Sequence, residues 1–258
     1  MTSIALHTFS GTGNTFLVAD MLKAGFEQQG CTVDAFRIED IRKEKLAVDF
    51  AAYDILGIGS PVLGFTAPTI MMDFVRSLPQ GNGQKVFIFR TAAGVIPVNY
   101  NASKGIIRIL ERKGYVVDYE RIFVIAGNWA MKFDDQVVLR LHAAARERTA
   151  VTCKELLAGK SRLYPVNLLS KALYGFIGVS SRLGLRFVGV DYKVTADCTH
   201  CGKCVRECPV DNIYEKNGKI KFKLECMSCM RCIYTCPENA IQPRLFKAFA
   251  LQGGYDIQ

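Results

Sequence analysis

Apolar runs and amphipathic segments alternate along the first 150 residues. The apolar, β-prone runs at 3–9 and 85–90 predict strands that are buried on both faces. After the first run, Leu17, Val18 and Leu22 recur at helical spacing and predict an amphipathic helix. The same patterns predict strands at 3–9, 32–38, 54–60, 85–90 and 121–126, and helices at 14–29, 68–78, 103–113 and 134–159. This alternation is typical of an α/β domain with a doubly wound, five-stranded parallel sheet.

Residues with known preferences for helix ends support two of these helices. Pro68 stands at the start of one helix, where its fixed φ and missing N–H are tolerated. Ser103 is expected to cap the next helix, and Gly114 is expected to end it.

The pattern changes after residue 159. Residues 160–193 are apolar, basic and rich in glycine, and they match neither neighbouring segment. We interpret them as a connector that packs on one or both of two domains, 1–159 and 194–258. The alternative is a basic amphipathic segment that contacts a membrane surface or an acidic partner.

The C-terminal region contains an internal repeat. Residues 197–213 and 225–241 have the same cysteine spacing at an offset of 28 residues, and Asn217-Gly218 between them predicts a β-hairpin. Each copy reads C-x2-C-x2-C-x3-C-P. The repeat uses eight of the ten cysteines, namely Cys198, Cys201, Cys204, Cys208, Cys226, Cys229, Cys232 and Cys236.

This spacing favours two [4Fe–4S] clusters. Three thiolates from one tight loop can reach three irons of a cubane cluster, and the fourth must come from elsewhere. Two zinc sites are the alternative, but zinc needs only C-x2-C pairs, which explains neither the third cysteine nor the proline. Cys31 and Cys153 lie outside the repeat and are expected to be small buried hydrophobic residues.

Residues 194–243 resemble bacterial two-cluster ferredoxins, in which the fourth cysteine of each run binds the other cluster. The resemblance implies one-electron transfer at low potential. It also implies crossed ligand sets. These sets are Cys198, Cys201, Cys204 and Cys236 for the first cluster, and Cys226, Cys229, Cys232 and Cys208 for the second.

The loop at 10–15 lies between the first expected strand and the first expected helix. Its two glycines let backbone N–H groups turn inward, its hydroxyls add donors, and the helix N-terminus adds its dipole. These features predict a phosphate-binding nest. No Gly-Lys pair follows, so the loop is not a Walker loop, and it does not have the GxGxxG pattern.

The loop resembles the FMN phosphate loop of flavodoxins, whose Ser/Thr-x-Thr-Gly-x-Thr pattern is matched by Ser10, Thr12, Gly13 and Thr15. The resemblance extends over residues 1–150 and implies a flavodoxin-like sheet that binds FMN beyond the carboxyl ends of its strands. Phe65 and Trp129 are the candidates for stacking on the flavin ring. The implied FMN-binding residues are Ser10, Gly11, Thr12, Gly13, Asn14, Thr15, Ser60, Pro61, Val62, Leu63, Gly64, Phe65, Thr91, Ala92, Ala93, Gly94, Asn128 and Trp129.

Composition and charge limit the classes of partner. Half of the 258 residues are hydrophobic, which is enough to bury sizeable cores. Lys and Arg outnumber Asp and Glu by 33 to 24, and a net charge of +9 alone would favour nucleic-acid binding. However, residues 151–196 hold seven basic and two acidic residues, and anionic cofactors would cancel much of the remaining charge. We therefore expect no nucleic-acid partner and favour acidic redox partner proteins.

The sequence also bears on location. Residues 1–16 lack the basic and apolar regions of a secretory signal. The longest uncharged run, 55–72, contains two prolines and three glycines, so it is not expected to span a membrane. We expect a cytoplasmic protein, in which ten cysteines point to metal or redox chemistry.

Both halves together resemble the flavodoxin–ferredoxin fusion proteins sometimes called ferrodoxins. The resemblance implies an electron-transfer flavoprotein that passes single electrons between two [4Fe–4S] clusters and FMN, and on to a partner redox enzyme. The alternative is a flavin-dependent reductase of a small substrate, fed by the clusters, with a pocket lined by Phe65, Asn99, Tyr100 and Trp129. Direct oxidation of a nicotinamide nucleotide is not expected, because its Gly-rich fingerprint is missing from the sequence.

Overall fold

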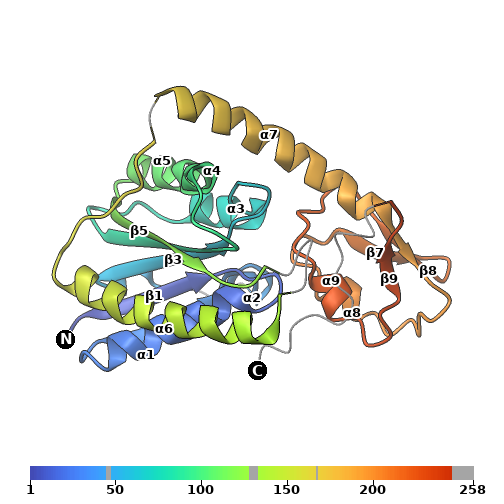
Figure 1. Cartoon of the computed structure of the whole chain (residues 1–258), viewed down its shortest axis with the longest axis horizontal. Helices are drawn as coiled ribbons and strands as arrows, with labels where there is room; N and C mark the ends of the chain where they lie inside the picture. Colours follow the sequence, from blue (N-terminus) through green and yellow to red (C-terminus); the bar gives the residue numbers. More distant parts are fainter. Residues whose placement is uncertain (45–47, 128–132, 167, 246–258) are drawn as a thin grey trace.

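The computed structural model describes residues 1–44, 48–127, 133–166 and 168–245 (Figure 1). Its main sheet has five parallel strands in the order β2-β1-β3-β4-β5. This is the flavodoxin-like strand order of doubly wound folds, so the predicted fold class is confirmed. The strands are β1 (Ser3–Thr8), β2 (Thr32–Arg37), β3 (Ile55–Pro61), β4 (Lys85–Ala92) and β5 (Val116–Val124).

Helices cover both faces of this sheet, because the side chains of each strand alternate between two cores. On one face, α1 (Asn14–Glu27) and α6 (Asp135–Leu157) pack over Ile4 and Leu6 of β1. On the other face, the core includes Ala5 and residues of α3 (Thr69–Ser77) and α5 (Lys104–Arg112). Shorter helical segments are α2 (Ile38–Glu44), α4 (Pro97–Tyr100), and the 3-10 turns Phe50–Ala52 and Asn101–Ser103.

Of the two residues predicted to mark the ends of α5, Gly114 does so and Ser103 does not. Gly114 ends the helix as predicted, and its φ of 80° is the left-handed conformation that favours glycine. Ser103 does not cap the helix, because its hydroxyl donates to the buried carboxylate of Glu120 instead. Strand β5 begins at Val116, five residues before the predicted start, because Val117 and Tyr119 already point into the two cores.

The connector contains the long helix α7 (Leu168–Asp191), which the sequence pattern did not predict. Figure 1 shows α7 running along one edge of the molecule from the sheet domain to the C-terminal domain. Its inner face packs closely enough at Gly178 that an added Cβ would lie 2.8 Å from the methyl group of Thr66. Its outer face carries large apolar side chains that are 49–75% exposed, namely Leu173, Phe176, Val179, Leu183, Phe187 and Val190.

The start of the connector joins the edge of the sheet. The N–H of Arg162 donates to the carbonyl of Asp118 (2.8 Å), and the N–H of Glu120 donates to the carbonyl of Arg162 (2.7 Å). These bonds extend the sheet beyond β5 by one bridge. No helix in the described part of the chain is long and apolar enough to cross a membrane.

The C-terminal domain is built from short elements around a small core. Asn217 and Gly218 have φ values of 52° and 64°, as a type I′ turn requires, so the predicted hairpin is confirmed. The core contains Tyr192, Met230 and Ile241. The elements are β6 (Tyr192–Val194), α8 (Lys203–Arg206), β7 (Ile213–Lys216), β8 (Lys219–Phe222), α9 (Arg231–Tyr234) and β9 (Ile241–Pro243).

Candidate cofactor sites

A cavity of about 360 Å³, here called the sheet-domain cavity, lies at the carboxyl ends of the sheet strands. Three loops that the sequence singled out line it together, although they are far apart in the chain. Cavities of this size and position are typical of small-molecule sites in doubly wound folds. The lining residues are Ser10–Thr12, Asn14, Thr15, Pro61–Phe65, Thr91–Gly94, Ile96, Asn99, Ile125–Gly127, Leu185 and Ser228–Met230.

Ser10 orders the first of these loops from beneath. Its buried hydroxyl oxygen accepts hydrogen bonds from the N–H groups of Gly13 (3.0 Å) and Thr15 (3.1 Å). Gly13 has a φ of 103°, a conformation that a side chain would strain. The Thr15 hydroxyl lies 2.8 Å from the Thr91 hydroxyl, which ties the loop to the end of β4. The loop therefore has a fixed, glycine-dependent shape at the start of α1.

The second loop makes a tight turn after β3. Leu63 and Thr66 exchange backbone hydrogen bonds of 3.0 Å in both directions. Gly64 and Phe65 between them have φ values of 51° and 62°. A left-handed conformation is uncommon for phenylalanine, and it turns the half-exposed Phe65 ring to the wall of the cavity.

A buried charge network supports the third loop. Arg90 and Glu120 are almost fully buried and form an ion pair of 2.9 Å. Burial lowers the pKa of Arg90 from its ordinary value, and the Glu120 carboxylate opposes this shift. Arg90 also donates to the carbonyl of Asn99, whose side-chain amide donates to the carbonyl of Gly94 (3.0 Å). The network therefore fixes the 91–94 loop from behind.

The eight cysteines of the repeat surround two separate small cavities. Cys198, Cys201 and Cys204 of the first run share one cavity with Cys236 of the second run. The other cavity, here called the second thiol cavity, is bounded by the remaining cysteines of the repeat, Cys208, Cys226, Cys229 and Cys232. This arrangement groups the thiols as in the crossed ligand sets.

Residues in the left-handed backbone conformation shape both cysteine loops in the same way. His200 and Gly202 in the first run have φ values of 55° and 68°, and Ser228 and Met230 in the second have 54° and 64°. These positions are related by the 28-residue offset of the repeat. They turn the backbone sharply between cysteines, so three thiols of one short run reach the same cavity.

The thiols are held by burial and by backbone donors. Burial raises the pKa of Cys229 to about 12 and that of Cys232 well above its usual range, so both thiols stay protonated unless a metal displaces the proton. The N–H of Asn212 donates to the sulfur of Cys208 (3.2 Å), and the N–H of Ala240 donates to that of Cys236 (3.3 Å). Such bonds stabilise thiolates and tune cluster potentials.

In the described residues, no group of three or more Cys, His, Asp or Glu side chains has the spacing to hold one metal ion. A single zinc ion lies about 2.3 Å from each sulfur. The thiolates of a cubane cluster bind four different irons, so they surround a wider space.

The cysteine loop of the second run also forms part of the sheet-domain cavity. Gly11 packs so closely on it that an added Cβ would lie 2.1 Å from the carbonyl oxygen of Cys229. Ser228 donates its hydroxyl to the carbonyl of Leu185 in α7 (3.1 Å). Hence one wall of the cavity consists of Ser228–Met230, immediately beside the second thiol cavity.

Arg231 fastens the two domains together at this point. Its guanidinium donates to the carbonyls of Ser10 and Gly11, the latter at 3.2 Å, and to the carboxylate of Glu39. The Arg231–Glu39 pair is largely buried, and it stands over the ring of Phe9. Removing one partner of a buried pair of this kind costs about 3–5 kcal/mol.

Most predicted cofactor residues line the cavities, with three kinds of exception. Gly13 shapes its loop and Ser60 is buried in β3, but neither lines the sheet-domain cavity. Asn128 and Trp129 lie outside the described residues. Tyr100, an expected wall of a substrate pocket, stacks instead on Tyr164 at 4.4 Å.

Some residues of the sheet-domain cavity come from segments in which no motif predicted this site. Leu185 of α7 and Ser228–Met230 line the sheet-domain cavity but were not expected there. No pattern links these segments to the sheet edge, because the contact depends on how the two domains dock. The one sequence feature that points to this contact is the positive charge of Arg231 inside the second cysteine run.

Comparison with known protein families bears out the C-terminal half. Residues 191–237 match the 4Fe-4S dicluster domain family. The sheet domain before it has the flavodoxin-like strand order. The chain fits a flavodoxin–ferredoxin fusion. No curated protein sequence matches this chain.

Several solved flavodoxin structures align with the sheet domain of this chain. An archaeal flavodoxin is 16% identical with a TM-score of 0.39, and covers 59% of this chain and 99% of its own. Megasphaera elsdenii flavodoxin is 23% identical with a TM-score of 0.39, and covers 56% of this chain and 98% of its own. Bacillus cereus flavodoxin 2 is 19% identical with a TM-score of 0.42, and covers 60% of this chain and 99% of its own. The strand order, rather than these scores, defines the fold.

Proposed function

We propose that this chain passes single electrons between two [4Fe–4S] clusters and FMN, and on to a partner redox enzyme. The flavodoxin-like sheet and the 4Fe-4S domain support a redox electron-transfer role. The observation that carries the proposal is the shared wall: Cys229 borders both the sheet-domain cavity and the second thiol cavity.

The sheet-domain cavity has the features that FMN requires. The loop from Ser10 to Thr15 lines the cavity and leads into the N-terminus of α1, whose dipole suits a phosphate. The remaining walls are mainly apolar, with Val62, Leu63 and Phe65 on one side, which suits a flat aromatic ring. When bound, FMN would exchange electrons singly or in pairs, whereas each cluster carries one.

The residues around the cavity have positioning roles in this proposal. Arg90 and Glu120 hold the 91–94 loop, and Ser10 holds the phosphate loop. Arg231 holds the second cysteine run against that loop. The two cofactor sites are thereby kept in contact within one molecule, without a free flexible tether.

Cofactor content is the direct test of the proposal. Protein purified without oxygen is expected to contain about eight irons and one FMN per chain, as two cubane clusters and one flavin require. Iron, acid-labile sulfide, zinc and the extracted flavin are measured on the same sample. Zinc in place of iron, or FAD in place of FMN, would contradict the proposed cofactors.

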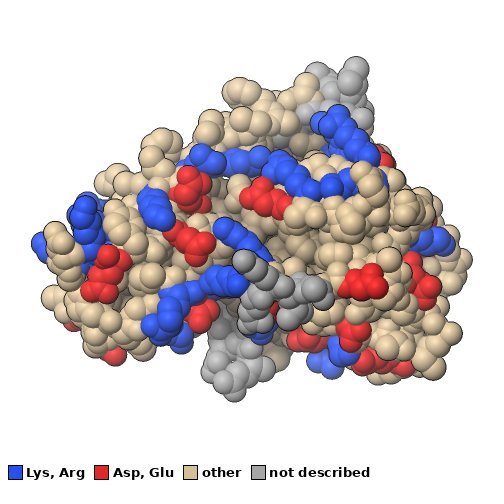
Figure 2. Space-filling model, turned by 180° about the vertical axis from the view of Figure 1, so that it is seen from behind, with Lys and Arg blue, Asp and Glu red and all other residues tan. Residues whose placement is uncertain are grey.

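We also propose that the partner is an acidic redox protein. Figure 2 shows a band of basic side chains along one face, and the whole chain carries a net charge of +9. Such a surface attracts acidic partners at a rate that salt decreases. Reduction of the flavin by acidic electron carriers is expected to slow as ionic strength rises, whereas a rate that does not depend on salt would contradict this choice.

A further inference from the structure

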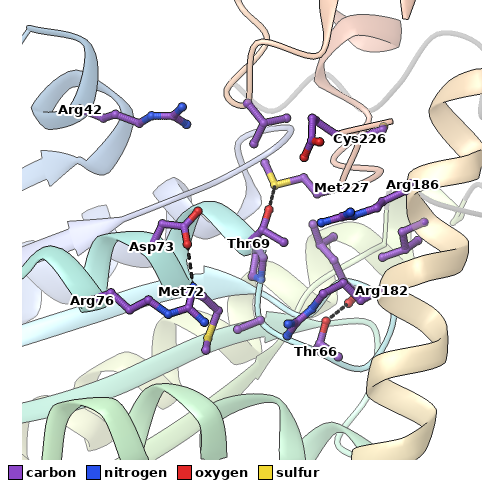
Figure 3. A pocket seen from close by; sticks show the side chains of 16 residues that line it. Arg42, Thr66, Thr69, Met72, Asp73, Arg76, Arg182, Arg186, Cys226 and Met227 are labelled. Carbon is purple, nitrogen blue, oxygen red and sulfur yellow. Dashed lines mark hydrogen bonds and ion pairs between the residues drawn. The ribbon is translucent and has the colours of Figure 1, made fainter. Parts of the chain in front are cut away.

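A second cavity, of about 300 Å³, lies between α3, α7 and the second cysteine run (Figure 3). Leu63 and Leu185 line both this cavity and the sheet-domain cavity, so the two are separated by a thin apolar wall. Cys226 and Met227 form its side toward the cluster domain. The electron-transfer proposal assigns no role to this cavity.

Four arginines line this second cavity, Arg42, Arg76, Arg182 and Arg186, against two carboxylates, Asp73 and Glu225. Two arginines have partners already. Arg76 pairs with Asp73 at 2.7 Å, and Arg42 pairs with Asp211 at 3.5 Å. The other two stand on successive turns of α7, and Figure 3 shows both reaching from that helix toward α3.

The positive charges of Arg182 and Arg186 are not neutralised by an ion pair with any described residue. Like charges four positions apart on a helix repel each other. In addition, the Nε–H of Arg182 is buried and has no hydrogen-bond partner in the described part of the chain. A buried donor without a partner destabilises the fold unless a ligand supplies an acceptor.

We propose that this cavity binds a small oxyanion through Arg182 and Arg186. Guanidinium groups present parallel donors that match the paired oxygens of a phosphate or carboxylate group. The ligand would neutralise the repelling pair and give the buried Nε–H an acceptor. Thr69, whose hydroxyl makes a long contact of 3.9 Å with the sulfur of Met227, offers a further donor.

The position of the cavity gives the bound anion a consequence for redox chemistry. This part rests on the proposed function. Cys226 lines the cavity and belongs to the second thiol group, so an anion there adds negative charge beside that cluster. Negative charge disfavours the reduced form, so binding is expected to lower the potential of the second cluster and to leave the first less affected.

The test is calorimetric titration of the protein, with its cofactors bound, using inorganic pyrophosphate and, separately, citrate. Saturable binding of either probe supports the site, and the tighter probe identifies a phosphate or a carboxylate ligand. Arg182→Gln and Arg186→Gln are each expected to weaken binding about tenfold, the loss of a charge-assisted hydrogen bond. Arg182→Lys is expected to restore only part of the affinity, because lysine lacks the paired donors.

Arg108→Gln is the matched control, because Arg108 is an exposed arginine of α5 that lies outside the cavity. Equal binding by the wild type and both α7 variants would overturn the site, as would equal weakening by the control. Far-UV circular dichroism of the unliganded variants shows that the helices are retained. The proposed function fails separately, if the protein lacks iron or flavin while pyrophosphate or citrate still binds.

Discussion

His7 is a fully buried imidazole on β1. It lies among the rings of Phe36, Phe50 and Phe74, at 5.2–5.4 Å between centroids. Burial lowers its pKa from 6.5 to about 4. The structure therefore favours the neutral imidazole, and a proton can be added only at the expense of the fold.

The sign of the pH effect follows from this shift. Between pH 6.5 and 4 the unfolded chain binds a proton that the folded chain does not, so the free energy of unfolding decreases as pH falls. The slope approaches about 1.4 kcal/mol per pH unit. His7→Phe is expected to remove this contribution. Thermal unfolding by circular dichroism, between pH 7.5 and 5.5, should show a smaller acid loss in the variant than in the wild type.

Gly13 and Gly11 serve different purposes in the same loop. Gly13 needs a positive φ, whereas Gly11 needs space beside Cys229. Gly13→Val is expected to abolish FMN binding and to leave the iron content near normal, because the strain stays in the sheet domain. Flavin and iron are assayed on the same purified protein. Equal loss of both cofactors would refute the independence of the two domains.

Among the elements, the two cysteine runs cross over at their fourth members. Cys208 lies with the second run and Cys236 with the first. Cys208→Ala is therefore expected to damage the cluster of Cys226, Cys229 and Cys232. Cys236→Ala is expected to damage the other cluster. Electron paramagnetic resonance of the two reduced variants distinguishes the clusters. Damage confined in each case to the cluster of the mutated run would exclude the crossed ligand sets.

The helices and strands differ in how well the sequence pattern predicts them. Strand–helix alternation identified the sheet, because each buried strand is a local apolar run. The candidate FMN loop and the cysteine runs could be predicted because their chemistry lies in short motifs. Helix α7 was missed because its glycines and its mixture of apolar and basic residues are typical of a connector, and its large apolar residues are exposed rather than packed in a core. The wall formed by Leu185 and Ser228–Met230 depends on docking across more than a hundred residues, which no local pattern encodes.

At the scale of the whole molecule, we expect Arg231 to keep electron transfer within one chain, because it holds the second cysteine run against the 10–15 loop. Photoreduction of the clusters is expected to reduce the flavin at a rate independent of protein concentration. Arg231→Gln removes the pair with Glu39 and the contacts with the phosphate loop. Its intramolecular phase is expected to slow markedly, while Arg244→Gln, at an exposed arginine of the same domain, behaves as wild type. A wild-type rate that rises with protein concentration would show transfer between molecules and exclude the fixed route.

The contact between Gly11 and Cys229 has a consequence for biogenesis. One wall of the sheet-domain cavity is the loop around Cys229, a proposed ligand of the second cluster. With the proposed cofactors, we expect an asymmetric order of maturation: cluster insertion can proceed without flavin, but firm retention of flavin needs the cluster loop in place. Cells starved of iron would accumulate a chain that has lost both cofactors, whereas cells starved of riboflavin would accumulate one that has lost only the flavin.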